Sequence, residues 1–345
     1  MGATSESFQP HGAPEGSHPA SGSVKDLLGS AIRYRGLPVL IGTVILWFVV
    51  ALHSHGRFGA TLESTLTVGA FLSLVGLGQM FVVAAGSGNI DLSVPYVLTF
   101  GAYLAGGIIN GGSGSLLLAV VVTVAFGLAV GVANATVIVH LNVPPIVATL
   151  AVGFLIESGY LELGTHQSNL AHNASNQLGN TVSNVATGGF GGFSYMAVIA
   201  IGCVVIAQLI LWRSWFARRL LAMGQSLAAA RLSGVATNRI TVTVYCISAV
   251  MAALVGVLLG GYIGGGSLDM GTSYQLGSVA VVILGGCFIS GGVANSPGVG
   301  IAAMFLTLLI TLTDILNVSP GVQQIIEGVI IVGLLSVVGS ARNVE

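Results

Sequence analysis

The chain has 345 residues, of which 54% are hydrophobic and only 6% are charged, and its formal net charge is −1. Soluble domains normally carry about 25% charged residues, so this composition excludes an ordinary soluble globular protein. The small net charge also gives no electrostatic basis for nucleic-acid binding. With a mean hydropathy of +0.95, the chain is predicted to be an all-α polytopic membrane protein.

The N-terminal segment differs in composition from the rest of the chain. Residues 1–24 are rich in Ser, Gly, Pro and Ala and contain no apolar run, which predicts a disordered tail. The first apolar run begins near Leu37, after Lys25, Arg33 and Arg35, so it is predicted to stay in the protein as an anchor rather than to be a cleaved signal peptide. Residues 25–345 are therefore predicted to form a single transmembrane domain.

Ten apolar segments approach the roughly 17 to 25 residues that a helix needs to cross a bilayer. The predicted spans are 37–53, 64–86, 92–109, 116–139, 145–163, 194–212, 240–262, 274–290, 298–316 and 322–339. The eighth is short and is interrupted by glycine. Cys203, Cys246 and Cys287 lie in separate apolar runs without metal-ligand spacing, so no metal site is predicted.

Basic residues set the expected orientation. Five of them fall between the sixth and seventh spans, in a stretch from Leu163 to Leu268 that contains no acid: Arg213, Arg218, Arg219, Arg231 and Arg239. The positive-inside rule places this loop in the cytoplasm. The basic residues before the first span, and Arg342 after the last, place both termini on the same side. Residues 164–192 carry no charge and are predicted to form a long outer loop.

Two sequence matches indicate an internal duplication. "LNVPPIVATLAVG" from Leu141 returns 175 residues later as "LNVSPGVQQIIEG" from Leu316, and "GNIDLSVPYVL" from Gly88 returns 178 residues later as "GSLDMGTSYQL" from Gly266. The two halves would be about 64–163 and 240–339, containing spans two to five and seven to ten. Spans two and seven run in opposite directions, so we predict an inverted repeat, an architecture typical of transporters.

Asp91 is the only charged residue between Ser64 and Ile156, and the weaker match aligns it with Asp269. One interpretation is a helix cap, in which Asp91 accepts hydrogen bonds from the first amides of a span that begins at Leu92. The other is a polar lining of the permeation path, or the titrating group of a proton-coupled carrier. The sequence leaves both open.

The chain has no predicted ATPase site of its own. Its only lysine, Lys25, lacks the glycines and the Ser or Thr of a phosphate-binding loop, so an ATP-driven pump would need a separate ATPase subunit. In the predicted cytoplasmic loop, "SLAAARLSG" favours a short helix closed by Gly234. This helix would either dock into a partner's groove or simply begin the seventh span, and composition does not decide between them.

Several stretches together resemble one known family. "SGNIDLSVPYVLTFGAYLA", "LNVPPIVATLAVGFL", "GQSLAAARLSGVATNRITVTVYCISAVMAALVGVLL", "LGGCFISGGVANSPGVGIAAMFL" and "VSPGVQQIIEGVIIV" are similar, in this order, to the ribose-type permeases of bacterial ABC sugar importers. The resemblance implies a multi-pass, ten-span subunit of the bacterial inner membrane that pairs as a dimer. Separate ATPase subunits would bind ATP and Mg, a periplasmic sugar-binding protein would dock outside, and this chain would be neither an enzyme nor a cofactor carrier. It also implies an ATPase-coupling segment made of Gly224, Ala229, Ala230, Arg231, Leu232, Ser233 and Gly234.

The expected function is transport of a monosaccharide by alternating access. A neutral sugar needs hydroxyl, amide and aromatic contacts rather than ion pairs. The candidate lining residues are Asn89, Asp91, Ser93, Tyr96, Asp269, Ser273 and Tyr274. The alternatives are a permease for branched-chain amino acids or nucleosides, an ion-coupled secondary carrier, and a channel or scaffold. The sugar, and whether two identical permeases pair, stay open.

Overall fold

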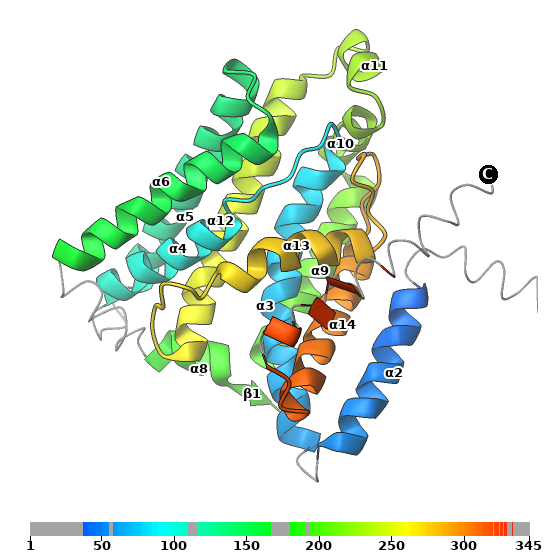
Figure 1. Ribbon diagram of the computed structural model, residues 1–345. Helices are drawn as coiled ribbons and strands as arrows, with labels where there is room; N and C mark the ends of the chain where they lie inside the picture. The colour runs from blue at the N-terminus through cyan, green and yellow to red at the C-terminus, as the bar shows by residue number, and fades with distance from the viewer. Residues whose placement is uncertain are drawn as a thin grey trace, which may run out of the picture. The chain divides into compact units, whose positions relative to one another are not determined.

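A computed structural model describes residues 37–54, 58–109, 116–166, 180–190 and 193–319, together with residues 321–323, 325, 326, 328, 329 and 333. The predicted tail, residues 1–24, lies outside the described residues, as do Arg342 and most of the predicted span 322–339. All the described residues belong to one compact unit, Arg35–Glu345 (Figure 1).

Nine of the predicted spans each correspond to one helix. These helices are α2 (Leu37–His53), α3 (Phe58–Ala84), α4 (Val94–Ile109), α5 (Leu116–His140), α6 (Pro145–His166), α9 (Tyr195–Arg213), α12 (Thr237–Ile263), α13 (Thr272–Leu284) and α14 (Ser296–Ile315). Within the described ranges, six of them are long and apolar enough to cross a membrane, whereas α2, α4 and α13 are shorter apolar helices. The prediction of an all-α polytopic membrane protein is confirmed.

The structure differs from the predicted boundaries at several places. Helix α3 begins at Phe58, well before the predicted start at residue 64. Helix α13 ends at Leu284 rather than near residue 290, because the following connection contains Gly286, Gly291 and Gly292, all with positive φ. The predicted outer loop also contains regular structure. It holds the end of α6, the helix α8 (Asn180–Thr187) and the strand β1 (Gly189–Phe190), which pairs with β2 (Phe193–Ser194).

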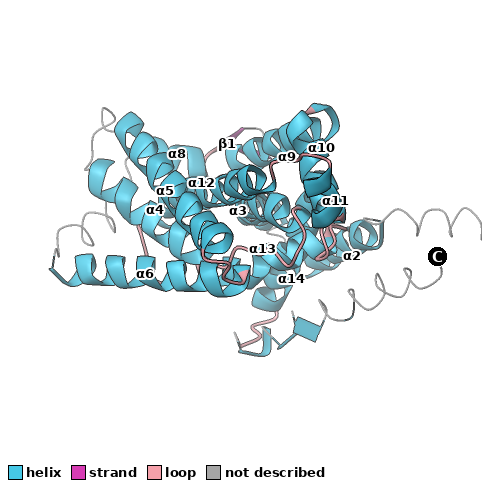
Figure 2. Ribbon diagram, turned by 90° about the horizontal axis from the view of Figure 1, so that it is seen from above, coloured by secondary structure: helices cyan, strands magenta, loops and turns pink. Residues whose placement is uncertain are grey.

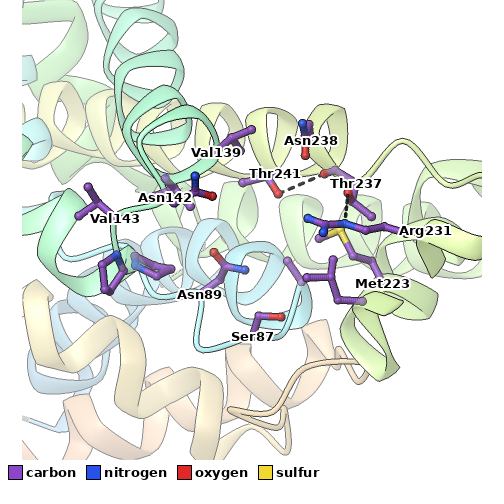
Figure 3. Close-up of a pocket in the computed structure, with 15 residues that line it drawn as sticks. Ser87, Asn89, Val139, Asn142, Val143, Met223, Arg231, Thr237, Asn238 and Thr241 are labelled. Atoms are coloured by element: carbon purple, nitrogen blue, oxygen red, sulfur yellow. Dashed lines mark hydrogen bonds between the residues drawn. The ribbon is translucent and has the colours of Figure 1, made fainter. Parts of the chain in front are cut away.

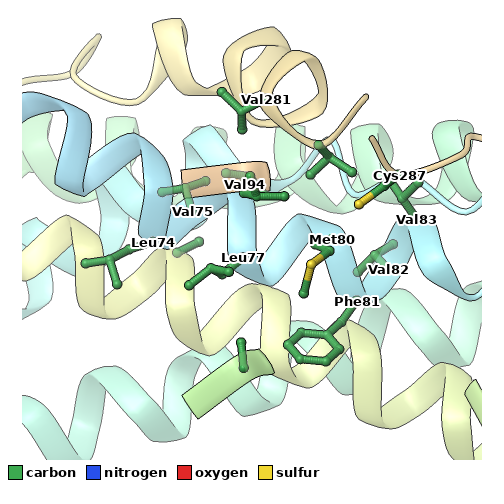
Figure 4. Packing of buried hydrophobic residues seen from close by; sticks show 14 of the residues in the cluster. Leu74, Val75, Leu77, Met80, Phe81, Val82, Val83, Val94, Val281 and Cys287 are labelled. Carbon is green, nitrogen blue, oxygen red and sulfur yellow. The ribbon is translucent and has the colours of Figure 1, made fainter. Parts of the chain in front are cut away.

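Helix α3 occupies the centre of the bundle (Figure 2). It packs against α9, α12, α13 and α14, and its side chains Phe71, Val75, Met80 and Val82 are almost fully buried. Figure 4 shows the closely packed apolar side chains along this helix. By contrast, α2, α5, α6 and α9 expose many large apolar side chains, as expected of helices that face lipid.

The packing of the helices follows the internal repeat. Helix α12 packs against α4 and α5 of the first half, and α3 packs against α13 and α14 of the second half. In Figure 1, α3 runs from the lower to the upper end of the bundle, whereas α12 runs from the upper to the lower end. The two halves are therefore inverted relative to each other, and each half buries the first long helix of the other.

The ends of the matching helices share a backbone conformation. Asn142 and Asn317, which follow α5 and α14, both adopt the left-handed conformation, with φ of 52° and 54°. In each copy the next amide turns back to the helix: Val143 N donates to Val137 O at 3.4 Å, and Val318 N donates to Thr313 O at 2.9 Å. Asparagine is one of the few residues other than glycine that adopts this conformation readily.

Replacement of Asn142 tests this backbone requirement. We expect Asn142→Val to lower the free energy of unfolding by about 1 to 2 kcal/mol, because a β-branched residue is strained at positive φ. Asn142→Gly should stay within about 1 kcal/mol of the wild type, because glycine adopts this conformation without strain. Thermal unfolding of the detergent-solubilised chain measures both variants. Equal stability of the valine and asparagine proteins would contradict the argument.

Candidate coupling and permeation site

The connection between α3 and α4 is a non-helical segment in which Asn89, Asp91 and Ser93 are buried, whereas Ser87 and Gly88 are exposed. Gly86, Ser87 and Gly88 have φ of 73°, 55° and 71°, so three consecutive residues take the left-handed conformation and end α3. Irregular backbone at membrane depth is stable only where protein groups satisfy its hydrogen bonds. We call residues 86–93 the first break.

Side chains from three helices bind the backbone of the first break. Leu92 N donates to Thr149 Oγ1 of α6 at 3.1 Å, and Gln275 Nε2 of α13 donates to Leu92 O at 3.4 Å. The Gln79 amide of α3, oriented with its nitrogen toward Asp91 O, donates there at 3.2 Å and accepts from Asp91 N at 3.1 Å. The break is thus held from both halves of the repeat.

Asp91 is completely buried. Its Oδ1 accepts from Ser93 N at 3.0 Å and from Ser93 Oγ at 2.6 Å, and its Oδ2 accepts from Ser248 Oγ of α12 at 2.7 Å. Ser93 Oγ in turn accepts from Asn134 Nδ2 of α5 at 2.9 Å. Three hydrogen bonds to the carboxylate offset much of the cost of burying it.

The predicted cap geometry at Asp91 is wrong in detail. Helix α4 begins at Val94, not Leu92, and the amide that Asp91 accepts belongs to Ser93, before the helix. The carboxylate instead joins the first break to α12, the first long helix of the other half. A bond between two segments so far apart in sequence could not be inferred from local spacing.

Asn89 is almost fully buried, and it connects the break to a cavity of about 280 Å³. Its Nδ2 donates to Gly86 O at 2.7 Å, and its Oδ1 accepts from Tyr245 OH of α12 at 3.0 Å. Figure 3 shows the cavity among the break, the α5–α6 connection and the start of α12. Its polar lining includes Ser87, Asn89, Asn142, Arg231, Thr237, Asn238 and Thr241.

The predicted coupling segment forms two helices, α10 (Trp215–Gln225) and α11 (Leu227–Leu232). Ser226 caps α11 by accepting from Ala229 N at 3.3 Å. Gly234 closes it with φ of 77°, as Gly234 N donates to Arg231 O and Val235 N to Ala230 O, both at 3.0 Å. The predicted short helix closed by glycine is confirmed, while α10 was not predicted.

Most of α11 projects into solvent. Leu232 is 91% exposed, whereas Ala230 is buried. Ala229, Arg231, Ser233 and Gly234 are also exposed. Arg231 reaches back toward the cavity, where its Nε donates to Thr237 Oγ1 at 3.5 Å. The exposed Leu and Ala side chains suit a partner's groove, and docking of an ATPase there stays a prediction.

Gly224, at the end of α10, meets both halves of the repeat. A Cβ on Gly224 would overlap the backbone atoms Ala84 O and Gly292 N, which already hydrogen-bond each other at 3.0 Å. A Cβ on Gly86 would lie 2.7 Å from Gly224 O, and one on Gly291 would overlap Gly86. We call Gly86, Gly224, Gly291 and Gly292 the glycine junction, where three chain segments touch backbone to backbone.

The glycine junction was only partly predicted. Gly224 was in the coupling segment, but Gly86, Gly291 and Gly292 were not among the candidate residues. The available signal was the pair of glycine-rich runs "GSG" and "SGG" at the ends of apolar spans. Nothing in the sequence alone shows that these runs meet.

The remaining candidate residues are not brought together in one cluster. Tyr96 is partly buried and packs edge-on against Phe154, with ring centroids 5.7 Å apart. Tyr274 is buried, whereas Asp269 and Ser273 are exposed. Whether any of the seven face a substrate path stays a prediction.

The two aspartates share a position but not an environment. Asp91 and Asp269 each lie three residues before a helix, α4 and α13 respectively. Asp91 is bonded by Ser248 of α12. At the 178-residue offset that aligns the two aspartates, the residue of α3 that corresponds to Ser248 is Ala70, which has no hydroxyl group to offer Asp269.

An inverted repeat of apolar helices, with a polar break inside it and a basic helix projecting at one end, defines a polytopic transport protein. The chain belongs to the family described as "Branched-chain amino acid transport system / permease component", whose model matches residues 61–335. The family match confirms the predicted permease class.

The relatives identified by sequence include three permease proteins. The chain is 29% identical over 268 residues to the inner membrane ABC transporter permease protein YjfF of Escherichia coli, covering 76% of this chain and 80% of the relative. It is 29% identical to the ribose import permease protein RbsC of Bacillus subtilis, with 76% and 79% covered. It is 26% identical to the autoinducer 2 import system permease protein LsrD of Salmonella paratyphi B, with 79% and 80% covered. The resemblance to ribose-type permeases is thereby confirmed, and no solved structure matches the chain.

Proposed function

We propose that this chain is the membrane-spanning permease subunit of an ABC importer for a monosaccharide or a closely related neutral, hydroxyl-rich solute. The observation that carries the proposal is the family match over residues 61–335, together with relatives named for the import of ribose and autoinducer 2. Separate ATPase subunits would supply the energy, with ATP and Mg bound there rather than in this chain.

The distribution of charge favours a neutral solute over an amino acid. The sequence contains no Lys or Arg between Arg57 and Arg213, and none between Arg239 and Arg342. These stretches include nearly all the predicted spans, so they provide no fixed cation to pair with an amino-acid carboxylate. Asp91 is already bonded to two serines. Branched-chain amino acids, named in the family description, remain the second candidate class.

The glycine junction supports a route for the power stroke. An ATPase that pushes on α11 would move α10, which directly precedes it in the chain. At Gly224 that movement reaches the end of α3 in one half and the α13–α14 connection in the other. Because backbone meets backbone there, no flexible side chain absorbs the displacement, and both halves would reorient together.

The assembly we propose has two permease chains in a bacterial inner membrane. The ends with α10 and α11 would face the cytoplasm, with both termini on that side, as the arginines favour. A periplasmic solute-binding protein would dock at the opposite end and deliver the substrate. Identical pairing of two copies is the simplest arrangement.

Reconstitution tests the proposal. The chain alone in liposomes should not accumulate radiolabelled ribose under a proton or sodium gradient. With its cognate ATPase and binding protein, it should accumulate ribose when ATP is supplied and not when ADP replaces ATP. Labelled leucine serves as the matched amino-acid substrate. Vigorous uptake by the chain alone would show an ion-coupled carrier, and ATP-driven uptake of leucine but not ribose would show an amino-acid importer.

A further inference from the structure

Helix α10 presents a basic and aromatic face to its surroundings. Trp215, Arg218 and Arg219 are exposed and lie on one side of the helix, at the i, i+3 and i+4 spacing. Ala217 and Leu220 on the other side are fully buried. The Arg218 Cζ lies 4.8 Å from the centre of the Trp215 ring, and the Arg219 Cζ lies 5.9 Å from it.

This face continues an apolar stripe on α9. The stripe consists of exposed side chains one turn apart, ending with Trp212, which is 70% exposed: Val198, Ile201, Val205, Leu209 and Trp212. Arg213 follows at the last residue of α9 and is also exposed. Along the chain, the stripe is therefore followed at once by Arg213 and, after the capping residue Ser214, by Trp215, Arg218 and Arg219 of α10.

Among the described residues, no acidic side chain compensates the charge of this corner. The sequence has no Asp or Glu from Leu163 to Leu268, and among the described residues no carboxylate pairs with Arg213, Arg218 or Arg219. Guanidinium groups bind phosphate oxygens through two parallel hydrogen bonds, and indole rings favour the membrane–water boundary. The chemistry that fits both parts of the surface is a phosphate joined to an acyl chain.

We infer that the α9–α10 corner binds an anionic phospholipid of the arginine-side leaflet. The headgroup phosphate lies against Arg213, Arg218 and Arg219, and an acyl chain follows the stripe on α9. A lipid fits better than a protein, because the arginines continue directly from a lipid-facing helix and α11, not α10, projects farthest from the bundle (Figure 1). This site is distinct from the cavity at Arg231.

Tryptophan fluorescence provides the test, because the chain has only three tryptophans. In a Trp47→Phe background, Trp212 and Trp215 report contact with brominated lipids. The full-length protein is placed in phosphatidylcholine vesicles that contain increasing amounts of brominated phosphatidylglycerol or brominated phosphatidylcholine. We expect brominated phosphatidylglycerol to reach half-maximal quenching at a mole fraction at least about fivefold lower than brominated phosphatidylcholine does. One basic residue near a charged leaflet contributes roughly that factor.

Two variants separate a built site from general positive charge. Arg218→Gln with Arg219→Gln should reduce the preference by about fivefold or more, whereas Arg239→Gln, which removes an exposed charge from α12 at the same end, should retain it. A preference that the double substitution leaves unchanged, or that Arg239→Gln reduces equally, overturns the inference. The inference is also overturned if the double variant keeps its lipid preference but no longer binds the ATPase subunit. The surface would then be a docking site for protein.

Two further measurements use the protein with all its arginines in place, so that the test still works if the double variant does not insert into the membrane. Raising the salt from about 50 to about 500 mM should shrink the preference, because screening shortens the range of the interaction to a few ångströms. An unchanged preference would overturn the inference. Millimolar inorganic phosphate should not displace the anionic lipid; complete displacement would indicate a site for soluble phosphate instead.

Discussion

Replacing Gly224 by alanine should reduce ATP-driven uptake about tenfold or more. The added methyl group would overlap Ala84 O and Gly292 N, and neither backbone atom can rotate away. Overpacking of this kind costs about 1 to 3 kcal/mol, so α10 must shift relative to one half or the other. Uptake by proteoliposomes containing the full complex measures the effect, with the ATPase rate recorded in parallel.

Gly202→Ala is the matched control for Gly224→Ala. It makes the same chemical change in α9, where nothing lies within 4 Å of the new Cβ. It should leave uptake unchanged. Gly86→Ala should reproduce the defect, because its Cβ would approach Gly224 from the other side of the junction. Normal uptake by Gly224→Ala, at wild-type levels of assembled complex, would remove the junction from the coupling route.

Replacing Asp91 by leucine should lower the free energy of unfolding by roughly 2 to 5 kcal/mol. The change removes a carboxylate that accepts three hydrogen bonds, and it leaves Ser93 N, Ser93 Oγ and Ser248 Oγ without that acceptor in a buried site. Each buried polar group left without a partner costs about 1 to 3 kcal/mol. Thermal unfolding in detergent measures the loss, and the amount of folded chain in membranes should fall in parallel.

Asp91→Asn distinguishes a structural role from a proton-coupled one. The amide oxygen can still accept from Ser93, and the Ser248 hydroxyl can turn to accept from the new NH₂ group. We expect near-normal stability and near-normal ATP-driven uptake. Loss of uptake with stability intact would favour a titrating role for Asp91 and hence the ion-coupled alternative.

Ser248→Ala serves as a milder comparison for both substitutions. It removes one of the three bonds to Asp91 and leaves the charge in place. A loss of about 1 to 2 kcal/mol is expected. A larger effect than that of Asp91→Leu would show that Ser248 acts through contacts other than the carboxylate.

The positions of the long helices could be predicted from sequence because apolar length alone decides them. Nine of the predicted spans match helices, and Asn142 and Asn317, at matching positions in "LNVPP" and "LNVSP", share the left-handed conformation. Helices α8 and α10 were missed because both are short and amphipathic rather than uniformly apolar. A search for apolar runs long enough to cross a bilayer does not detect such helices.

The candidate site was harder to predict, because its contacts join segments distant in sequence. Asp91 and Asp269 look equivalent within the repeat, yet Asp91 is buried and bonded to Ser248 on α12, whereas Asp269 is exposed. The glycine junction likewise depends on the meeting of the end of α10 with two connections distant in sequence. A single sequence shows where such residues lie along the chain, but it does not show which residues they contact in the folded protein.

Each half of the repeat packs around the first long helix of the other half, and this has a consequence for biosynthesis. While the ribosome is still making the second half, α3 has neither α13 nor α14 to cover it, and Asp91 lacks Ser248. A prematurely terminated chain would hold an uncovered carboxylate and amides in lipid, which makes it a recognisable target for membrane quality-control proteases. The permease therefore reaches its mature state only when translation is nearly complete.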